Sequence, residues 1–204
     1  MYENLFKSPL NRIFVYGTLK RGEPNHKFIE NNNKGYAKFV GIGQTVTKYP
    51  LVIATKYNIP FLLKQPNVGH HITGEVYDVD SKTMKYLDEL EEHPDFYVRT
   101  EDEVRLITDS EYKNEAKFDE VAAYFVIWHV VFLLLLFYPL LMSLQYQLQV
   151  GELIKAWIYF LPKFKHSLLS GPLYSSYSSD GQHGLKYMER YLRDLSYDHR
   201  TEVQ

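Results

Sequence analysis

The chain has 204 residues, enough for one domain with its own hydrophobic core. Its formal net charge is −2 and it carries no long basic run, which argues against nucleic acid as a partner. It contains no cysteine, so disulfides, thiolate nucleophiles and cysteine-based metal sites are excluded. The first twelve residues lack the apolar run of a secretory signal, and we expect a cytoplasmic protein.

The first half of the chain alternates short apolar runs with turn residues. Residues 12–16 (RIFVY) form such a run, which stops at Gly17. The glycines, proline and asparagine of residues 17–25 are typical of a loop. Further short strands are predicted at 39–47, 51–53, 61–63 and 71–79.

One helix is predicted after these strands. Ser81 is its expected N-cap, because a serine hydroxyl can accept a hydrogen bond from a backbone N–H of the first turn. Met84, Leu87 and Leu90 then recur at helical spacing. We expect Pro94 to end the helix, since proline cannot continue the hydrogen-bond ladder.

The second half of the chain has strands on either side of an apolar segment. The strands are predicted at 97–107 and 154–161, and a polar loop is expected at 108–120. The tail after residue 162 is rich in Ser, Gly, Tyr and His, and we expect it to be ordered only where it covers the core. Many short strands around one helix predict an α+β domain with a barrel-like sheet.

An acidic run follows the apolar face of the predicted helix. Leu87, Leu90 and Glu91 share this face, because residues three and four apart on a helix are neighbours. Glu89 and Glu92 are expected to face water. A carboxylate carried toward the interior is unusual, and burial would raise its pKa toward the range useful for proton transfer. The simpler interpretation is a solvated acidic surface, which charge runs usually form.

The loop after the first strand begins with YGTL at residues 16–19. A glycine directly after a strand can leave backbone N–H groups free to face a ligand, and such groups can hold a carboxylate or a developing oxyanion. The loop lacks the GxxxxGK[ST] pattern of a phosphate-binding loop. Without further evidence, a turn that merely connects two strands explains it equally well.

Several motifs in one order resemble the γ-glutamyl cyclotransferase (AIG2-like) family, and in particular its γ-glutamylamine cyclotransferase branch. The opening string RIFVYGTLKRGEPNH at 12–26 is similar to the start of that branch. The resemblance continues with YPLVI at 49–53, NIP at 58–60, GEVY at 74–77, LD at 87–88, Tyr97, Arg99, SYSSDG at 176–181 and HGLKY at 183–187.

The resemblance implies a fold, a reaction and a set of residues. The fold would be a small mixed β-barrel with flanking helices, forming a single domain over residues 1–204. Glu91 would be the catalytic acid and base, and the substrate would be held by the YGTL loop, namely Tyr16, Gly17, Thr18 and Leu19. The family needs no metal and no cofactor. Its partner is a small γ-glutamyl molecule.

The expected reaction converts the isopeptide between a γ-glutamyl group and a lysine side chain to 5-oxoproline and the free amine. Related branches of the family act on free γ-glutamyl amino acids, and this remains an alternative. A third alternative is an inactive or membrane-associated splice product with an interaction role.

The third alternative rests on the apolar segment, which interrupts the resemblance. Residues 121–142 contain no Asp, Glu, Lys or Arg, and a helix of that length would span about 33 Å, enough for a bilayer. A single span would separate the strands at 98–107 and 154–161, which should belong to one sheet. Membrane contact is therefore expected only if this segment is present in the mature protein.

Three interpretations of the segment are open. It is an extra helix packed on the domain, a membrane anchor on a broken domain, or a translated intron. We favour the intron, because residues 121–149 can be removed in frame and family-like sequence resumes near residue 150. Val121 has a codon beginning with GT, as splice donors do, and Gln149 can be encoded by CAG, which ends like an acceptor.

Overall fold

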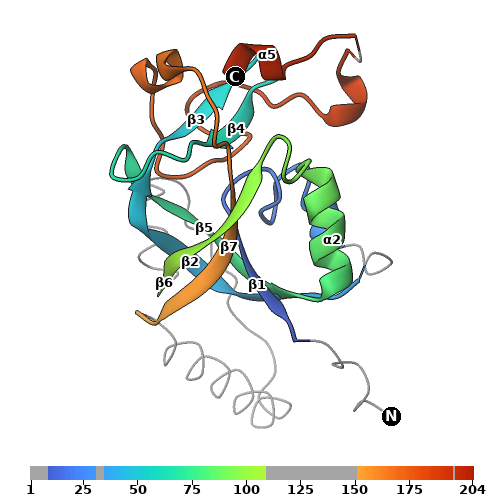
Figure 1. Ribbon diagram of the computed structural model, residues 1–204, viewed down its shortest axis with the longest axis vertical. Helices are drawn as coiled ribbons and strands as arrows, with labels where there is room; N and C mark the ends of the chain where they lie inside the picture. The colour runs from blue at the N-terminus through green and yellow to red at the C-terminus, as the bar shows by residue number, and fades with distance from the viewer. Residues whose placement is uncertain (1–8, 31–34, 109–150, 195) are drawn as a thin grey trace, which may run out of the picture.

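The computed structural model describes residues 9–30, 35–108, 151–194 and 196–204 (Figure 1). The apolar segment 121–149, and with it the choice between its three interpretations, lies outside the described residues. None of the helices in the described ranges is both long and apolar enough to span a membrane.

Five strands form a closed barrel, which confirms the expected α+β fold with a small mixed barrel. Their order around the barrel is β1 (Asn11–Val15), β5 (His70–Val79), β2 (Ala37–Tyr49), β6 (Val98–Ile107) and β7 (Leu153–Phe160). Neighbouring strands run antiparallel except at the closing seam, where β7 runs parallel to β1 through the pair Ile13–Trp157. The strand boundaries expected from the sequence hold to within two residues.

A second sheet and several short helices cover the barrel. Strands β3 (Leu51–Ala54) and β4 (Ile59–Leu62) form a two-stranded antiparallel sheet. The helical elements are α1 (Lys27–Glu30), α2 (Ser81–Leu90), the 3₁₀ helices η2 (His166–Ser170) and η3 (Arg190–Leu192), and α5 (Arg200–Val203). Figure 1 shows the C-terminal segment, in orange and red, running beside β3 and β4 at one end of the barrel.

Strand β1 is buried on both of its faces. Ile13 and Val15 belong to a buried cluster that also includes Leu87 of α2, whereas Phe14 belongs to a second cluster with Val76 of β5. Both faces must therefore be apolar, which explains why the sequence of β1 is a continuous apolar run and does not alternate between apolar and polar residues. The loop that begins at residue 16 thus starts from a rigid, fully packed strand.

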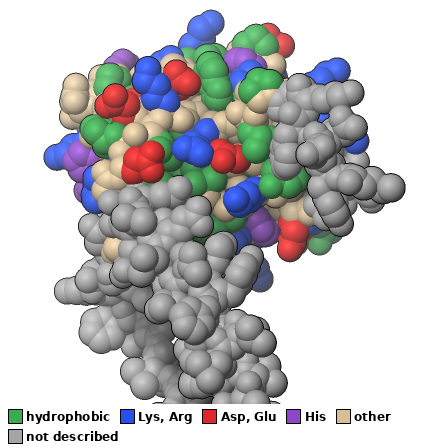
Figure 2. Space-filling model, turned by 90° about the horizontal axis from the view of Figure 1, so that it is seen from below, with side chains coloured by type: hydrophobic (Ala, Val, Ile, Leu, Met, Phe, Trp, Pro, Cys, Tyr) green, Lys and Arg blue, Asp and Glu red, His purple; other side chains and the backbone are tan. Residues whose placement is uncertain are grey.

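The outer surface carries charges of both signs. On the face of the barrel in Figure 2, acidic and basic side chains of the described residues lie interspersed. Arg12 and Asp78, on neighbouring strands, form one such ion pair, with 2.8 Å between Nε and Oδ1. Charges of opposite sign therefore offset one another locally, in keeping with a net charge of −2.

The N-cap of α2 is Asp80 and not Ser81, which corrects the expectation from the sequence. Asp80 has extended φ and ψ angles of −76° and 169°, and its Oδ1 accepts a hydrogen bond from the backbone N–H of Thr83 at 2.8 Å. Ser81 already lies in the first helical turn. A glycine is required at position 35, because a Cβ there would come within 2.5 Å of Asp80 Oδ1.

The helix ends in a Schellman motif, three residues before Pro94. Glu92 adopts a left-handed φ of 54°, and the N–H groups of Glu92 and His93 donate to the carbonyls of Glu89 and Asp88 at 3.3 and 2.9 Å. Glu91 is the C-cap, and its N–H still donates to the carbonyl of Leu87 at 2.9 Å. The local turn therefore stops the helix before the proline does.

The N-cap generates a test of the fold. Asp80→Ala should lower the free energy of unfolding by about 1 kcal/mol, because the N–H of Thr83 loses its acceptor. Asp80→Asn keeps an acceptor and should retain most of the stability. Lys85→Ala, on the exposed face of the same helix, is the control and should change little. Urea unfolding measures all three, and equal stability of the alanine and asparagine variants at position 80 would contradict the assignment.

Candidate active site

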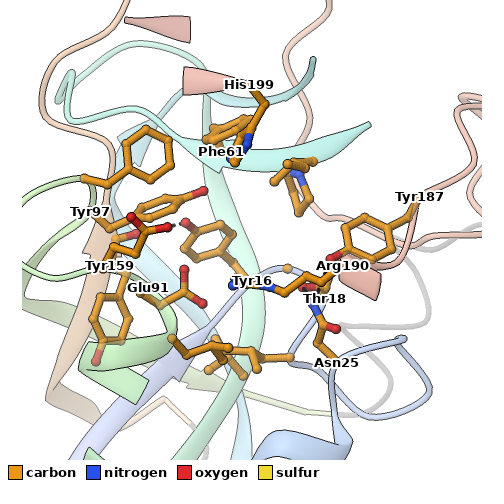
Figure 3. Close-up of a pocket in the computed structure, with 18 of the residues that line it drawn as sticks. Tyr16, Thr18, Asn25, Phe61, Glu91, Tyr97, Tyr159, Tyr187, Arg190 and His199 are labelled. Carbon is orange, nitrogen blue, oxygen red and sulfur yellow. Dashed lines mark hydrogen bonds between the residues drawn. The ribbon is translucent and has the colours of Figure 1, made fainter. Parts of the chain in front are cut away.

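One pocket brings together every site residue expected from the sequence. Residues 16–19 of the YGTL loop and Glu91 at the end of α2 all line it (Figure 3). Aromatic side chains from the barrel and from the C-terminal segment complete the walls; they are Phe14, Phe61, Phe96, Tyr97, Tyr159 and Tyr187. The pocket thus combines two groups that were separated by more than seventy residues in the chain.

The backbone of the loop, whose residues 16–19 line the pocket, has N–H groups without an acceptor among the described residues. The carbonyl of Gly17 accepts from Lys20 N at 3.1 Å, and that of Thr18 accepts from Asn25 N at 2.9 Å, so the loop folds back on itself. The N–H groups of Gly17, Thr18 and Leu19 donate to no residue in the described part of the chain. Three successive amides without an acceptor are an arrangement suited to holding an anion.

Side chains tie the loop to the C-terminal segment. Asn25 is buried, and its Nδ2 donates to Thr18 Oγ1 and to Tyr187 Oη, each at 2.9 Å. The buried ammonium of Lys20 donates to the carbonyl of Tyr177. The bonds to Tyr187 and Tyr177 join residues more than 150 positions apart, so the C-terminal segment helps to hold the loop in place.

The carboxylate of Glu91 is the only acidic group of the described pocket lining that has no protein partner. Figure 3 shows it beside Tyr16, and it accepts no hydrogen bond from the described residues. Glu92 also lines the pocket but pairs with Arg200. Burial raises the pKa of Glu91 above its ordinary value of 4.5, while the charge of Arg190 opposes this rise. The carboxyl group is therefore poised to exchange a proton nearer to neutral pH.

Three tyrosines surround Glu91 and stay neutral. Burial raises the pKa of Tyr16, Tyr97 and Tyr159 above the ordinary value of 10.0, and the negative charge of Glu91 raises each pKa further. Tyr16 Oη donates to the backbone carbonyl of Tyr159 at 2.9 Å, which links β1 to β7. These side chains provide an apolar wall around the carboxylate without adding charge.

A second layer of contacts holds Tyr159 in position. Its hydroxyl donates to Asp88 Oδ1 at 2.7 Å, and Arg99 pairs with the same carboxylate, with 3.0 Å between Nε and Oδ1. Asp88 lies on the last turn of α2, three residues before Glu91. The end of the helix is thereby fixed against β6 and β7, which fixes the direction in which Glu91 leaves the helix.

The C-terminal segment supplies pocket residues that the sequence did not predict. Tyr187, Arg190, Arg193 and His199 line the pocket, although this tail was expected only to cover the core. Tyr187 belongs to the HGLKY motif, so a signal for it was present. Arg190 begins the short helix η3, and Arg193 and His199 lie outside the helices; nothing in the spacing of the three indicated that they reach the pocket.

Histidines and acids do not gather into a metal site in the described ranges. No group of three or more His, Asp or Glu side chains there is arranged to hold an ion. Burial lowers the pKa of His199, the histidine that lines the pocket.

Comparison with known proteins gives a family match. The family model described as "Gamma-glutamyl cyclotransferase, AIG2-like" matches residues 13–129. The γ-glutamylaminecyclotransferase of Mus musculus is 35% identical over 178 residues, which are 87% of this chain and 96% of that protein. A Drosophila melanogaster relative is 58% identical over 88 residues, and this match spans 43% of the chain and only 56% of the relative.

A solved structure matches the fold. The crystal structure of an AIG2-like protein from Mus musculus superimposes with a TM-score of 0.67 at 34% sequence identity. The match covers 91% of this chain and 100% of that chain. The similarity therefore extends through β7 and the C-terminal segment and is not confined to the first half of the sequence.

The raised pKa of Glu91 generates a test that needs no substrate. A carboxyl group with a higher pKa in the folded protein adds stability below its unfolded pKa, and this stability is lost as the pH rises through the folded value. Glu91→Gln removes this loss, so the variant should be more stable than the parent at pH 7.5. The difference should shrink as the pH falls to 4.

Urea unfolding at the two pH values measures the effect. Glu89→Gln removes a carboxylate from the exposed face of the same helix and is the matched control, with little pH-dependent change expected. A Glu91→Gln variant that is less stable than the parent at pH 7.5, or whose advantage does not depend on pH, would show that Glu91 is well solvated or paired.

Proposed function

Because the chain belongs to the γ-glutamyl cyclotransferase, AIG2-like family, we propose that it converts a γ-glutamyl amine to 5-oxoproline and the free amine. The substrate we propose is the isopeptide between a γ-glutamyl group and the side chain of lysine. One observation carries the proposal: Glu91, whose carboxylate is unpaired, lines the same pocket as residues 17–19, whose backbone amides have no acceptor in the described chain. The reaction needs one group that moves a proton and one that holds negative charge.

The proposed reaction is a ring closure within the substrate. The nitrogen of the α-amino group attacks the γ-carbonyl carbon, which forms the new C–N bond of the five-membered ring. The bond between this carbon and the leaving nitrogen then breaks. An α-amine has a pKa of about 7.7 to 8, so it must lose a proton to become a nucleophile. Glu91 takes this proton and, after the attack, the second surplus proton of the ring nitrogen, and it passes each in turn to the leaving nitrogen, so that the products are a neutral lactam N–H and an ammonium.

The environment of Glu91 supports both halves of the transfer. A carboxylate with its ordinary pKa would be too weak a base. Near neutral pH, too small a fraction of it would carry a proton to act as an acid. Burial among Tyr16, Tyr97 and Tyr159 raises the pKa of Glu91 and so brings its acid and base forms closer in population. The tyrosines remain protonated and do not compete as bases.

The loop amides have the chemistry to stabilise the intermediate. Attack on the γ-carbonyl places negative charge on its oxygen, and backbone N–H groups that already lack acceptors can donate to it without reorganising. Gly17 also lets Pro60 pack close to the loop, because a Cβ at position 17 would lie only 3.0 Å from Pro60 Cγ. A pocket that holds amine and carbonyl in contact lowers the barrier further.

Replacing the proposed acid and base tests the assignment. Glu91→Gln should lower the rate of 5-oxoproline release from γ-glutamyl-ε-lysine by about 10²- to 10⁴-fold, since the amide cannot accept the proton. Glu89→Gln is the control and should keep the parental rate, because Glu89 is exposed and lies outside the pocket. Chromatographic assay of 5-oxoproline measures both, and a folded Glu91→Gln variant with parental turnover would remove Glu91 from the mechanism.

A comparison of two substrates tests the branch of the family. We expect a higher kcat/KM for γ-glutamyl-ε-lysine than for γ-glutamyl-alanine, because the chain is similar to the γ-glutamylamine branch over most of its length. The assay is the same release of 5-oxoproline. A clear preference for the alanine conjugate would assign the chain to free γ-glutamyl amino acids instead.

A further inference from the structure

Two arginines of the C-terminal segment line the same pocket as Glu91. Arg190 begins η3, and Arg193 follows the end of this short helix. Figure 3 shows Arg190 beside Thr18 and Tyr187, at the wall formed by the C-terminal segment. The mechanism described above uses neither of them.

Neither arginine forms an ion pair with another described residue, although the charge of Arg190 acts on Glu91 across the pocket. In the ranges that the structure describes, the ion pairs involve other residues, and no acid pairs with Arg190 or Arg193. Arg190 is exposed to solvent, whereas Arg193 is partly buried, where a guanidinium normally pairs with a carboxylate. Both positive charges remain available to a ligand.

Arg193 is fixed in place but incompletely bonded. Its Nε donates to the carbonyl of Met188 at 3.0 Å, and its guanidinium carbon lies 5.2 Å and 5.1 Å from the ring centres of Tyr57 and Tyr187. The Nη2 atom is buried and has no hydrogen-bond partner. A buried donor without an acceptor destabilises the folded state, so such an atom commonly marks a place where a ligand supplies the acceptor.

The charges of the pocket and of a γ-glutamyl group do not match one to one. A γ-glutamyl group has one ammonium and one carboxylate. Glu91 can take the ammonium, and one guanidinium, or the loop amides, can take the carboxylate. At least one unpaired guanidinium is then left over. A second carboxylate on the ligand, carried by the leaving amine, would balance it.

We propose that Arg190 and Arg193 bind a carboxylate on the leaving amine, so that the enzyme selects γ-glutamyl conjugates of amino acids over those of simple amines. The inference rests on the proposed function, because it names the part of the same substrate that faces the C-terminal segment. Arg190 is a specificity-determining residue in this account. A planar guanidinium suits the task, since it can donate two parallel hydrogen bonds to one carboxylate.

A matched pair of ligands isolates the carboxylate. γ-Glutamyl-ε-lysine and γ-glutamyl-cadaverine have the same chain and the same terminal ammonium and differ only in the carboxylate of lysine. Calorimetry with Glu91→Gln protein measures the binding of each without turnover. We expect the lysine conjugate to bind about tenfold more tightly, the effect of one charge-assisted hydrogen-bonded pair. Adding Arg190→Gln should bring the ratio of the two affinities close to one.

The control removes a positive charge from the same segment. Lys186→Gln, at an exposed position outside the pocket, should keep the tenfold ratio. Arg190 is itself exposed, so its replacement should leave thermal unfolding unchanged. Equal affinity of the two ligands for the Glu91→Gln protein would overturn the proposal. So would an Arg190→Gln variant that weakens both ligands equally, because Arg190 would then bind the carboxylate of the glutamyl unit.

Turnover separates this inference from the proposed function. Wild-type protein that releases 5-oxoproline equally well from both conjugates is a cyclotransferase without the carboxylate site. Protein that releases none is not a cyclotransferase for these amines, while the calorimetric ratio still reports on Arg190. In active protein, Arg190→Gln should also move the acid limb of the kcat/KM profile to higher pH, because the charge of Arg190 lowers the pKa of Glu91.

Discussion

Strand β7 pairs with β6 on one side and with β1 on the other, and this pairing closes the barrel. The candidate site depends on it directly. The backbone of Tyr159 on β7 receives the hydroxyl of Tyr16, and the hydroxyl of Tyr159 holds Asp88 at the end of α2. β7 also leads into the C-terminal segment that carries Tyr187 and Arg190. Without β7, the loop at 16–19 and the carboxylate of Glu91 would lose the contacts that hold them in one pocket.

The site gathers groups that a stable protein would normally satisfy internally. The carboxylate of Glu91 and the N–H groups of residues 17–19 have no partner in the described ranges, and Arg193 keeps a buried donor without an acceptor. Each such group destabilises the folded state somewhat. The surrounding barrel, with both faces of β1 buried, offsets this loss. A pocket that leaves polar groups unpaired, so that a ligand can bind to them, is the expected compromise between stability and function.

Local patterns in the sequence predicted the parts that depend on local spacing. The apolar runs marked the strands, and the positions of Leu87, Leu90 and Glu91 predicted which acid turns toward the interior. Two details of α2 were wrong, because Asp80 competes with Ser81 for the cap and a left-handed Glu92 ends the helix before Pro94. The two arginines that line the pocket, Arg190 and Arg193, were missed for a different reason. They reach the pocket only through contacts such as Asn25 with Tyr187, which join distant parts of the chain.

The central claim is that Glu91 moves protons between the two nitrogens of the reacting γ-glutamyl group, while the amides of residues 17–19 stabilise negative charge on its γ-carbonyl oxygen. A crystal structure of the protein with 5-oxoproline, the proposed product, tests it most directly. The account predicts the ring nitrogen within hydrogen-bond distance of the Glu91 carboxylate and an oxygen of the product on the loop amides. A product molecule bound elsewhere, for example in the cavity beside Lys20 and His183, or no bound product at millimolar concentration, would contradict it.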